Sequence, residues 1–326
     1  MPKLQSTIHV VMRMLDNVID INYYPTEAAK RANVRHRPVG LGMMGMQDAL
    51  YLRRIPFDSQ EAVKFNDEIV EAIAYYAYAA SSNLADERGS YSSFAGSKWD
   101  RGLMPLDTLE QLEKERGVIL QVGRDSRLDW DALRDKIKVQ GMRNSNCLAI
   151  APTATISNIM GCTPCIEPSY KHIHTKSNLS GEFVRTNDYL VKELMDLGIW
   201  DEEMLSDLKY FDGSIQAIER IPDGVRLVTK PHLRLSRPGC CNAAAARQKW
   251  LDQSQSVNLF LAETTRERRH LCTVKLGKRG LKTTYYLRTI NKSSIDSANR
   301  ERKRSEPASA CSLEAMRNGT ICESCQ

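Results

Sequence analysis

Apolar residues recur at helical spacing in four stretches of this chain. The first stretch runs from Ile8 to Ile19, and Ser6 or Thr7 stands in position to cap a helix there. The second is predicted to begin at Asp58, within a capping-box pattern, and to end before Gly89. These two stretches predict a helix at the start of the chain and a longer one soon after it.

Two further helices are predicted from Asp129 to Gly141 and from Asn187 to Gly198, each with a capping side chain before it and a glycine after it. Short extended runs lie between the helical stretches. They are His36 to Leu41, Asn144 to Ala151, Val257 to Leu261 and Leu281 to Thr289. Extended runs that alternate with helices predict an α/β domain with a largely parallel sheet.

The pattern changes near residue 290. From Asn291 onward the chain is rich in Ser, Arg, Lys and Glu and has almost no large apolar residues. Such composition cannot bury a core and is typical of a flexible segment. We therefore expect one α/β domain over residues 1–289 and a flexible tail over residues 290–326, which ends in the C-x-x-C pair Cys322 and Cys325.

Composition narrows the class of protein. The chain has 326 residues, 42% of them hydrophobic, and its nine cysteines are an odd number at irregular spacing. These features argue against a secreted disulfide framework and favour a reducing cytoplasm. No apolar run is long enough to span a bilayer and no signal peptide is recognisable, so no membrane partner is expected.

The net charge of +6 comes largely from two basic runs, residues 266–269 and 299–304. Aromatic residues do not interleave with these basic side chains, as they do in many nucleic-acid-binding surfaces. We interpret the runs as solvated surface or tail, and no nucleic-acid partner is expected.

A glycine-rich segment, Gly40 to Gly45, matches the dinucleotide-binding pattern G-x-G-x-x-G. The strand before it can be only a few residues long, and two methionines stand where a pyrophosphate-binding loop would open a helix. Close packing of a helix against a strand is the favoured explanation for these glycines.

A second segment, from Ala151 to Ser157, follows an extended run and is rich in hydroxyl groups and small side chains. A helix that begins there would direct free backbone N–H groups and the positive end of its dipole outward. That arrangement binds phosphate without a lysine. A helix cap with no ligand is the structural alternative.

Cys162 and Cys165 form a second C-x-x-C pair. Together with Cys322 and Cys325 it would supply the four sulfurs of a structural zinc site. The terminal pair could instead carry electrons as a dithiol or a disulfide. The spacing alone leaves both chemistries open.

Two adjacent tyrosines, Tyr285 and Tyr286, fall in an extended run. Consecutive strand side chains point to opposite faces, so one ring in the core and one at the surface is the ordinary outcome. Tyrosine is also readily oxidised to a neutral radical, and two stacked phenols could relay such a radical if the strand ends or kinks there.

Several segments together resemble the large, catalytic (alpha) subunit of class I ribonucleotide reductase. They occur in the family order and cover most of the chain. The matching segments are Arg37-Pro38-Val39-Gly40-Leu41-Gly42, Arg143-Asn144-Ser145-Asn146, Ala151-Pro152-Thr153-Ala154-Thr155, Ile166-Glu167-Pro168, Leu179-Ser180-Gly181-Glu182-Phe183, Asp252-Gln253-Ser254-Gln255-Ser256, Leu281-Lys282-Thr283-Thr284-Tyr285-Tyr286-Leu287-Arg288-Thr289 and the terminal C-x-x-C pair.

The resemblance implies a role for each candidate site. The substrate-phosphate loop would be formed by Thr153, Ala154, Thr155, Ile156 and Ser157. Tyr285 and Tyr286 would transfer the radical, and Cys322 and Cys325 would form a mobile dithiol. It further implies that no cofactor is bound in this chain, that the radical comes from a metal-containing small (beta) subunit, and that thioredoxin or glutaredoxin is the reductant.

The resemblance also implies the fold and the limits of the chain. The expected fold is α/β, the C-terminal part of the family's ten-stranded barrel. The Asn-x-Cys-x-Glu finger loop of the family is not found in this sequence, and Cys147 lies at a different place in the family order. We therefore expect a split or truncated subunit that reduces ribonucleoside diphosphates for DNA synthesis only with an N-terminal half supplied in trans. A non-catalytic remnant or a zinc-binding protein is the alternative.

Overall fold

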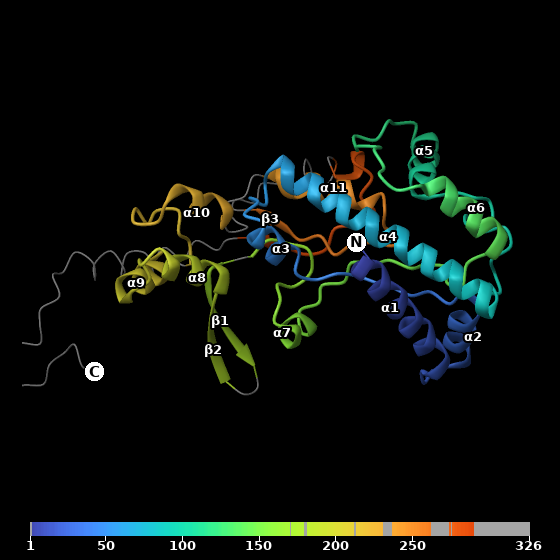
Figure 1. Cartoon of the computed structure of the whole chain (residues 1–326), viewed down its shortest axis with the longest axis horizontal. Helices are drawn as coiled ribbons and strands as arrows, with labels where there is room; N and C mark the ends of the chain where they lie inside the picture. Colours follow the sequence, from blue (N-terminus) through green and yellow to red (C-terminus); the bar gives the residue numbers. More distant parts are fainter. Residues whose placement is uncertain are drawn as a thin grey trace, which may run out of the picture. The chain divides into compact units, whose positions relative to one another are not determined.

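The computed structural model describes residues 2–169, 171–178, 181–211, 213–230, 237–261, 274 and 276–289. All of them belong to one compact unit, Met1–Thr289. Figure 1 shows their order along the chain. The helices are α1 (Pro2–Ile21), α2 (Glu27–His36), α3 (Met46–Leu52), α4 (Gln60–Arg88), α5 (Pro105–Arg116), α6 (Trp130–Gln140), α7 (Ile156–Met160), α8 (Asp188–Asp196), α9 (Glu202–Tyr210), α10 (Asp223–Val228) and α11 (Arg237–Gln248). The strands are β1 (Ile173–Asn178), β2 (Gly181–Thr186), β3 (Leu259–Leu261) and β4 (Leu287–Thr289).

The four predicted helices are present as α1, α4, α6 and α8. Asp129 caps α6 by accepting a hydrogen bond from the Ala132 amide at 2.9 Å, and Asn187 caps α8. The start of α4 differs by one residue from the prediction. Ser59, not Asp58, accepts the capping bond from the Ala62 amide, because the Asp58 carboxylate forms an ion pair with Lys230 at 3.1 Å.

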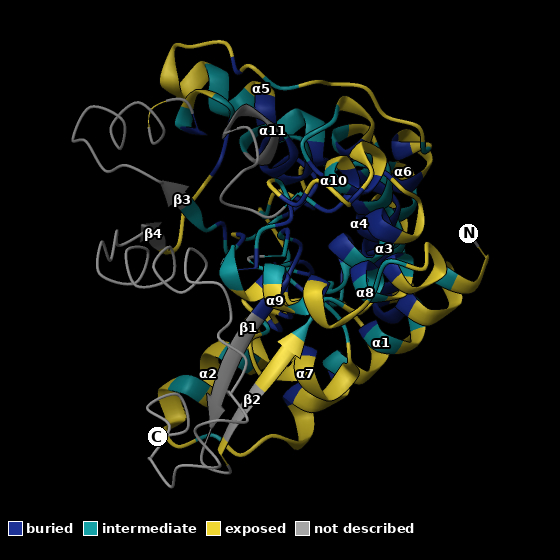
Figure 2. Cartoon of the chain, turned by 90° about the vertical axis from the view of Figure 1, so that its left-hand side faces the viewer, coloured by how far each residue is buried: buried dark blue, intermediate teal, exposed yellow. Residues whose placement is uncertain are grey.

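Helix α4 is the centre of the largest hydrophobic core, and α1, α6 and α11 pack against it (Figure 1). Its inner face is buried over most of its length (Figure 2). Tyr78 of this helix donates a hydrogen bond to the Trp250 carbonyl at 2.8 Å, and the Trp250 ring stacks on Trp130 at 5.2 Å. These aromatic contacts join three segments that are distant in the sequence, and burial of such rings dominates core energetics.

Four extended segments form a parallel array beside this core. Isolated parallel bridges pair Leu41 with Leu148 and Ile150 with Gln255, and β3 pairs with β4 in parallel. Hydrogen bonds from Ser256 N to Ile150 O and from Tyr285 N to Val257 O continue the array. The order of segments is therefore 39–41, 147–150, 253–261 and 285–289, which bears out the prediction of parallel extended runs in an α/β fold.

The expectation of the C-terminal part of a ten-stranded barrel is met only in part. Within the described ranges the extended segments form this array and an antiparallel hairpin of β1 and β2, and they do not close into a barrel. The hairpin leads into a second hydrophobic cluster built on α8 and α9. None of the helices that the structure describes is long and apolar enough to cross a bilayer.

The first two motifs of the resemblance meet in a buried polar network. The Arg37 guanidinium donates to the Asp16 carboxylate at 2.9 Å, and the Asn144 side chain donates to the same carboxylate and to the Arg37 carbonyl. All three side chains are buried. A buried charge is tolerated only when it is paired and hydrogen-bonded, so this network anchors α1 to the start of the parallel array.

Candidate functional site

The predicted phosphate loop directly follows the second extended segment, whose last paired residue is Ile150. Thr153 adopts a left-handed backbone conformation with φ of 52°. Its side-chain oxygen accepts a hydrogen bond from the Cys165 amide at 2.7 Å, and its carbonyl accepts one from the Ser157 amide at 3.1 Å. The loop is thus tied at both ends, which compensates for the strained conformation of a β-branched residue.

The middle of the loop is open. Within the described part of the chain, no hydrogen bond uses the backbone N–H groups of Ala154, Thr155 and Ile156. These three residues are exposed, and Thr155 precedes α7 without a side-chain capping bond. Unpaired N–H groups at a helix start are suited to an anionic oxygen. Ser157 differs from them, because it is buried beneath the loop.

The two tyrosines lie side by side just before β4. Their ring centroids are 4.1 Å apart, and the Tyr285 hydroxyl donates to the Tyr286 hydroxyl at 3.2 Å. This hydrogen bond raises the pKa of the Tyr285 phenol above its ordinary value. Both side chains are about half exposed, at 49% and 52%. The ordinary outcome of one core ring and one surface ring is therefore not observed.

An extra residue in the chain explains why the two rings share one side. Tyr285 N donates to Val257 O, whereas Leu259 N donates to Tyr286 O. A regular parallel ladder would use the N–H and the carbonyl of one and the same residue for these two bonds. One residue is therefore inserted at the tyrosine pair, as in a β-bulge, and the alternation of side chains is interrupted.

The loop and the tyrosine pair lie toward the same end of the parallel array. Ile150 pairs with Gln255, and the Tyr285 amide donates to the carbonyl of Val257, two residues further along the same segment. The loop that follows Ile150 leaves the array in that same direction. Active sites of α/β folds form at the carboxyl ends of parallel strands, where such loops gather.

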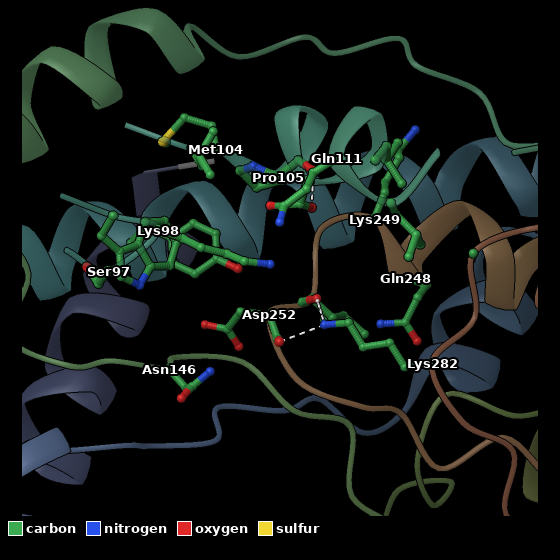
Figure 3. A pocket seen from close by; sticks show the side chains of 18 of the residues that line it. Ser97, Lys98, Met104, Pro105, Gln111, Asn146, Gln248, Lys249, Asp252 and Lys282 are labelled. Carbon is green, nitrogen blue, oxygen red and sulfur yellow. Dashed lines mark hydrogen bonds between the residues drawn. The ribbon is translucent and has the colours of Figure 1, made fainter. Parts of the chain in front are cut away.

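A cavity of about 430 Å³ occupies the opposite, amino-terminal end of the array. It is lined by the residues that come just before the paired positions, among them Asn146, Asp252 and Lys282 (Figure 3). The Asp252 carboxylate accepts hydrogen bonds from the amides of Cys147 at 2.6 Å and Leu148 at 2.9 Å. Burial raises the pKa of Asp252 to about 6, although these two bonds oppose the shift.

Lys282 completes this end of the array. Its ammonium group donates to the carbonyls of Leu251, Asp252 and Gln253, at 3.1, 2.6 and 3.4 Å (Figure 3). Burial lowers the pKa of Lys282, and the neighbouring Asp252 opposes this effect. Asp252 and Lys282 at the amino end thus bond to backbone groups of the chain itself. No role was predicted for either residue from the sequence.

The glycine-rich segment is used for close packing, as expected, but the partner is an extended segment and not a helix. A Cβ atom placed on Gly42 would lie 2.6 Å from the Ala149 carbonyl oxygen. This approach lets segment 39–41 pair with segment 147–150, and it explains the glycine without any nucleotide.

The cysteines that the structure describes differ in burial: Cys147 and Cys165 are buried, whereas Cys162 and Cys241 are partly exposed. Cys165 is buried, and burial raises the pKa of its thiol to about 11, which opposes the thiolate form that binds metals. Cys147 is also buried, with a raised thiol pKa. The described residues contain no cluster of three or more metal-ligating side chains. Cys322 and Cys325 lie outside the described residues.

These features define an α/β protein that presents a loop with open backbone amides and a pair of phenols in contact at the carboxyl ends of parallel segments. Residues 1–287 match the family "Ribonucleotide reductase, barrel domain". The chain therefore belongs to this family, and the resemblance drawn from its motifs is confirmed.

Relatives in three organisms show the same relationship. The chain is 53% identical to the ribonucleoside-diphosphate reductase subunit alpha of Chlamydia pneumoniae over 90% of its length, and 49% identical to that of Chlamydia trachomatis serovar D over 99%. It is 36% identical to the ribonucleoside-diphosphate reductase large subunit of Danio rerio over 99% of its length. It spans 28%, 33% and 42% of the lengths of these relatives, respectively.

Proposed function

We propose that this chain acts as the C-terminal part of the catalytic subunit of a ribonucleoside-diphosphate reductase. The observation that carries the proposal is the tyrosine pair, with ring centroids 4.1 Å apart and hydrogen-bonded hydroxyls at the same end of the array as the open loop. Two phenols with only a packing role would be expected to be buried, whereas these two are half exposed. Radical transfer requires contact between the two phenols, and their hydroxyls are hydrogen-bonded. The parallel array would then be a part of the family barrel.

In this proposal the loop binds the substrate. The open amides of Ala154, Thr155 and Ile156 donate to oxygens of the substrate diphosphate, and Thr153 and Ser157 hold the two ends of the loop. Backbone donors that are already oriented lose little entropy on binding and carry no charge of their own. The loop would therefore hold the ribose at a fixed distance from the tyrosine pair.

The tyrosines transfer the oxidising equivalent. Tyr286 and Tyr285 each lose one electron and one proton in turn, and each regains them when the radical moves on. The equivalent originates in a metal-containing small (beta) subunit and passes to a cysteine on the N-terminal half of the catalytic subunit. The 3.2 Å hydroxyl contact is short enough for a proton to move between the two phenols.

The reduction itself requires two electrons. The 2′-hydroxyl of the ribose leaves as water, and a cysteine pair on the N-terminal half is oxidised from two thiols to a disulfide. Cys322 and Cys325 would then reduce that disulfide by thiol–disulfide exchange, and thioredoxin or glutaredoxin would restore them. We place this chemistry in the cytoplasm, where thiols are kept reduced.

Reconstitution tests the proposal. The chain is purified alone and together with the N-terminal half of a related catalytic subunit, the small subunit and thioredoxin, and deoxyribonucleoside diphosphate formation is measured. We expect turnover from the complete mixture and none from the chain alone. A complete mixture that binds but does not turn over would reject the catalytic role, whereas turnover by the chain alone would reject the need for a second half.

A further inference from the structure

Glu167 lies on the segment that leads away from the predicted phosphate loop. One oxygen of its carboxylate accepts a hydrogen bond from the Asn258 backbone amide at 2.6 Å, and the other accepts one from the Asn258 side-chain NH₂ at 2.6 Å. Two bonds from one carboxylate to one residue fix both the backbone and the side chain of that residue. Charge-assisted bonds of this kind are short and strong.

The orientation of the Asn258 side chain follows from this contact. Because its NH₂ group donates to Glu167, its oxygen must point the other way. That oxygen accepts a hydrogen bond from the Tyr286 backbone amide at 3.3 Å. The inserted residue at the tyrosine pair takes this amide out of the regular ladder, and the Asn258 side chain supplies its partner.

The same segment is joined to the phosphate loop. The Thr153 side-chain oxygen accepts a hydrogen bond from the Cys165 amide, two residues before Glu167. A continuous set of contacts thus runs from Thr153 through Cys165 and Glu167 to Asn258 and then to Tyr286. Such a connection can hold the loop and the tyrosine pair in one geometry, since each contact is short and directional.

We infer that Glu167 and Asn258 are positioning residues for radical transfer, because together they hold the bulge that places Tyr285 and Tyr286 on one side. This inference rests on the proposed function and assigns it two residues that touch neither substrate nor the phenol oxygens. Glu167 and Asn258 act by fixing the distance between the rings of Tyr285 and Tyr286. Small displacements of reacting groups are costly, since about 1 Å can reduce a rate 100-fold.

The first test measures ring geometry without any turnover. Fluorotyrosine is introduced at position 285 or 286 of the full chain, and its ¹⁹F resonance is recorded in the unmodified background and in Glu167→Gln. The glutamine has one acceptor oxygen in place of two, and its NH₂ group must face one of the two Asn258 donors, so one of the two bonds breaks. We expect the resonances to shift toward those of solvent-exposed tyrosine; unchanged resonances would overturn the inference.

A double variant provides the rescue. In Glu167→Gln combined with Asn258→Asp, the glutamine NH₂ donates to the new carboxylate, and the carboxylate still accepts from the Tyr286 amide. All three bonds are regained with one donor direction reversed. The ¹⁹F resonances are expected to return to their original positions. Failure to return, with the chain still folded, would show that the bonds do not set the geometry.

Glu71 provides a matched control. It is a buried glutamate whose carboxylate also accepts backbone amide bonds, from Arg127 at 2.7 Å and Leu128 at 3.1 Å, away from the tyrosines. Glu71→Gln is expected to lower stability without moving either ¹⁹F resonance. A shift as large as that in Glu167→Gln would indicate a general loosening of the fold and would reject a specific positioning role.

Turnover in the reconstituted complex gives the second readout. Glu167→Gln should lower kcat about tenfold or more and change KM less than about twofold, and the double variant should recover most of the rate. An equal loss of kcat in Glu71→Gln, or a normal kcat in Glu167→Gln, would contradict the inference. An inactive complex with the unmodified chain would reject the proposed function, while the ¹⁹F experiment would still decide the positioning role.

Discussion

The two ends of the parallel array use their polar groups in opposite ways. At the amino end, the Asp252 carboxylate accepts hydrogen bonds from two backbone amides, and the Lys282 ammonium group donates to three backbone carbonyls. Both charged groups are therefore hydrogen-bonded to the backbone of the chain itself. At the carboxyl end, the amides of Ala154 to Ile156 have no partner among the described residues, and two phenols are half exposed. The same array thus has one end that stabilises it and one end with capacity for a ligand.

A large cavity is therefore not by itself evidence of the functional site. The cavity at the amino end contains lysines and an aspartate with a shifted pKa, which are common marks of an active site. Two of its charged groups, Asp252 and Lys282, are nevertheless occupied by contacts with backbone groups of the chain itself, and those of Lys282 are drawn in Figure 3. The shifted pKa of Asp252 reflects burial in a structural role, and the open groups lie at the other end.

The largest expected effect comes from removing either phenol at the carboxyl end. Tyr285→Phe or Tyr286→Phe should lower turnover in the reconstituted complex by at least about 1,000-fold, because a phenylalanine ring has no O–H to oxidise. Nucleotide binding and the free energy of unfolding should stay as they are, since both rings are half exposed. Turnover assays and equilibrium nucleotide binding measure the two effects, and normal activity in either variant would reject the relay.

The opposite result is expected at the amino end. Asp252→Ala leaves the Cys147 and Leu148 amides without their partner and should lower the free energy of unfolding by about 2–3 kcal/mol. Denaturant unfolding of the purified chain measures this loss. Asp131→Ala is the control, because that carboxylate is mostly exposed and should cost less than about 0.5 kcal/mol. Equal losses in the two variants would remove the contrast between the ends.

A buried histidine makes the stability of the fold depend on pH. His172 donates from Nε2 to the Thr229 carbonyl and accepts at Nδ1 from Asn187, and burial lowers its pKa from 6.5 to about 4. The unfolded chain therefore takes up a proton between pH 6.5 and pH 4 that the folded chain resists. The contribution of His172 to the free energy of unfolding is fully present above pH 6.5. It is lost as the pH falls to about 4, and the loss is about 3 kcal/mol at most.

Unfolding of the chain at several pH values measures this dependence. His172→Gln should remove that part of the pH dependence, whereas His36→Gln, at an exposed histidine, should leave it in place. A pH dependence that is the same in the His172 variant and the unmodified chain would show that another group is responsible.

The smallest effect on stability is expected at the open loop. Thr155 precedes α7 without a side-chain capping bond, so Thr155→Ala should change the free energy of unfolding by less than about 0.5 kcal/mol. The same change should weaken substrate binding a few-fold in the reconstituted complex, because it removes a hydroxyl beside the open amides. If stability fell while substrate binding stayed constant, the hydroxyl would belong to the fold and not to the site.

The helices were the most predictable part of the fold. Asp129 and Asn187 cap their helices as the sequence suggested, because a cap depends on residues within four positions of one another. The one-residue difference at α4 has a long-range cause, the ion pair of Asp58 with Lys230. The hairpin of β1 and β2 was not expected, since its residues show no clear alternation of apolar and polar positions.

The candidate site was only partly predictable. The loop and the two tyrosines could be named from their motifs. Glu167, Asn258 and Asp252 stood in or beside the same motifs, yet nothing in the residue pattern indicated their partners. Their hydrogen bonds join positions that are 28 to 105 residues apart. Contacts at such separation leave no periodic pattern in a single sequence.

The sequence alone was enough to predict helices α1, α4, α6 and α8, the parallel character of the extended runs and the family, because these depend on local spacing and on motifs in a fixed order. The tertiary structure decided which end of the array is open and why both tyrosines face the same side. Backbone hydrogen bonds between distant segments place the inserted residue at the tyrosine pair. Hydrogen bonds to backbone groups also occupy the charged side chains of Asp252 and Lys282. Such bonds exist only once the segments have come together.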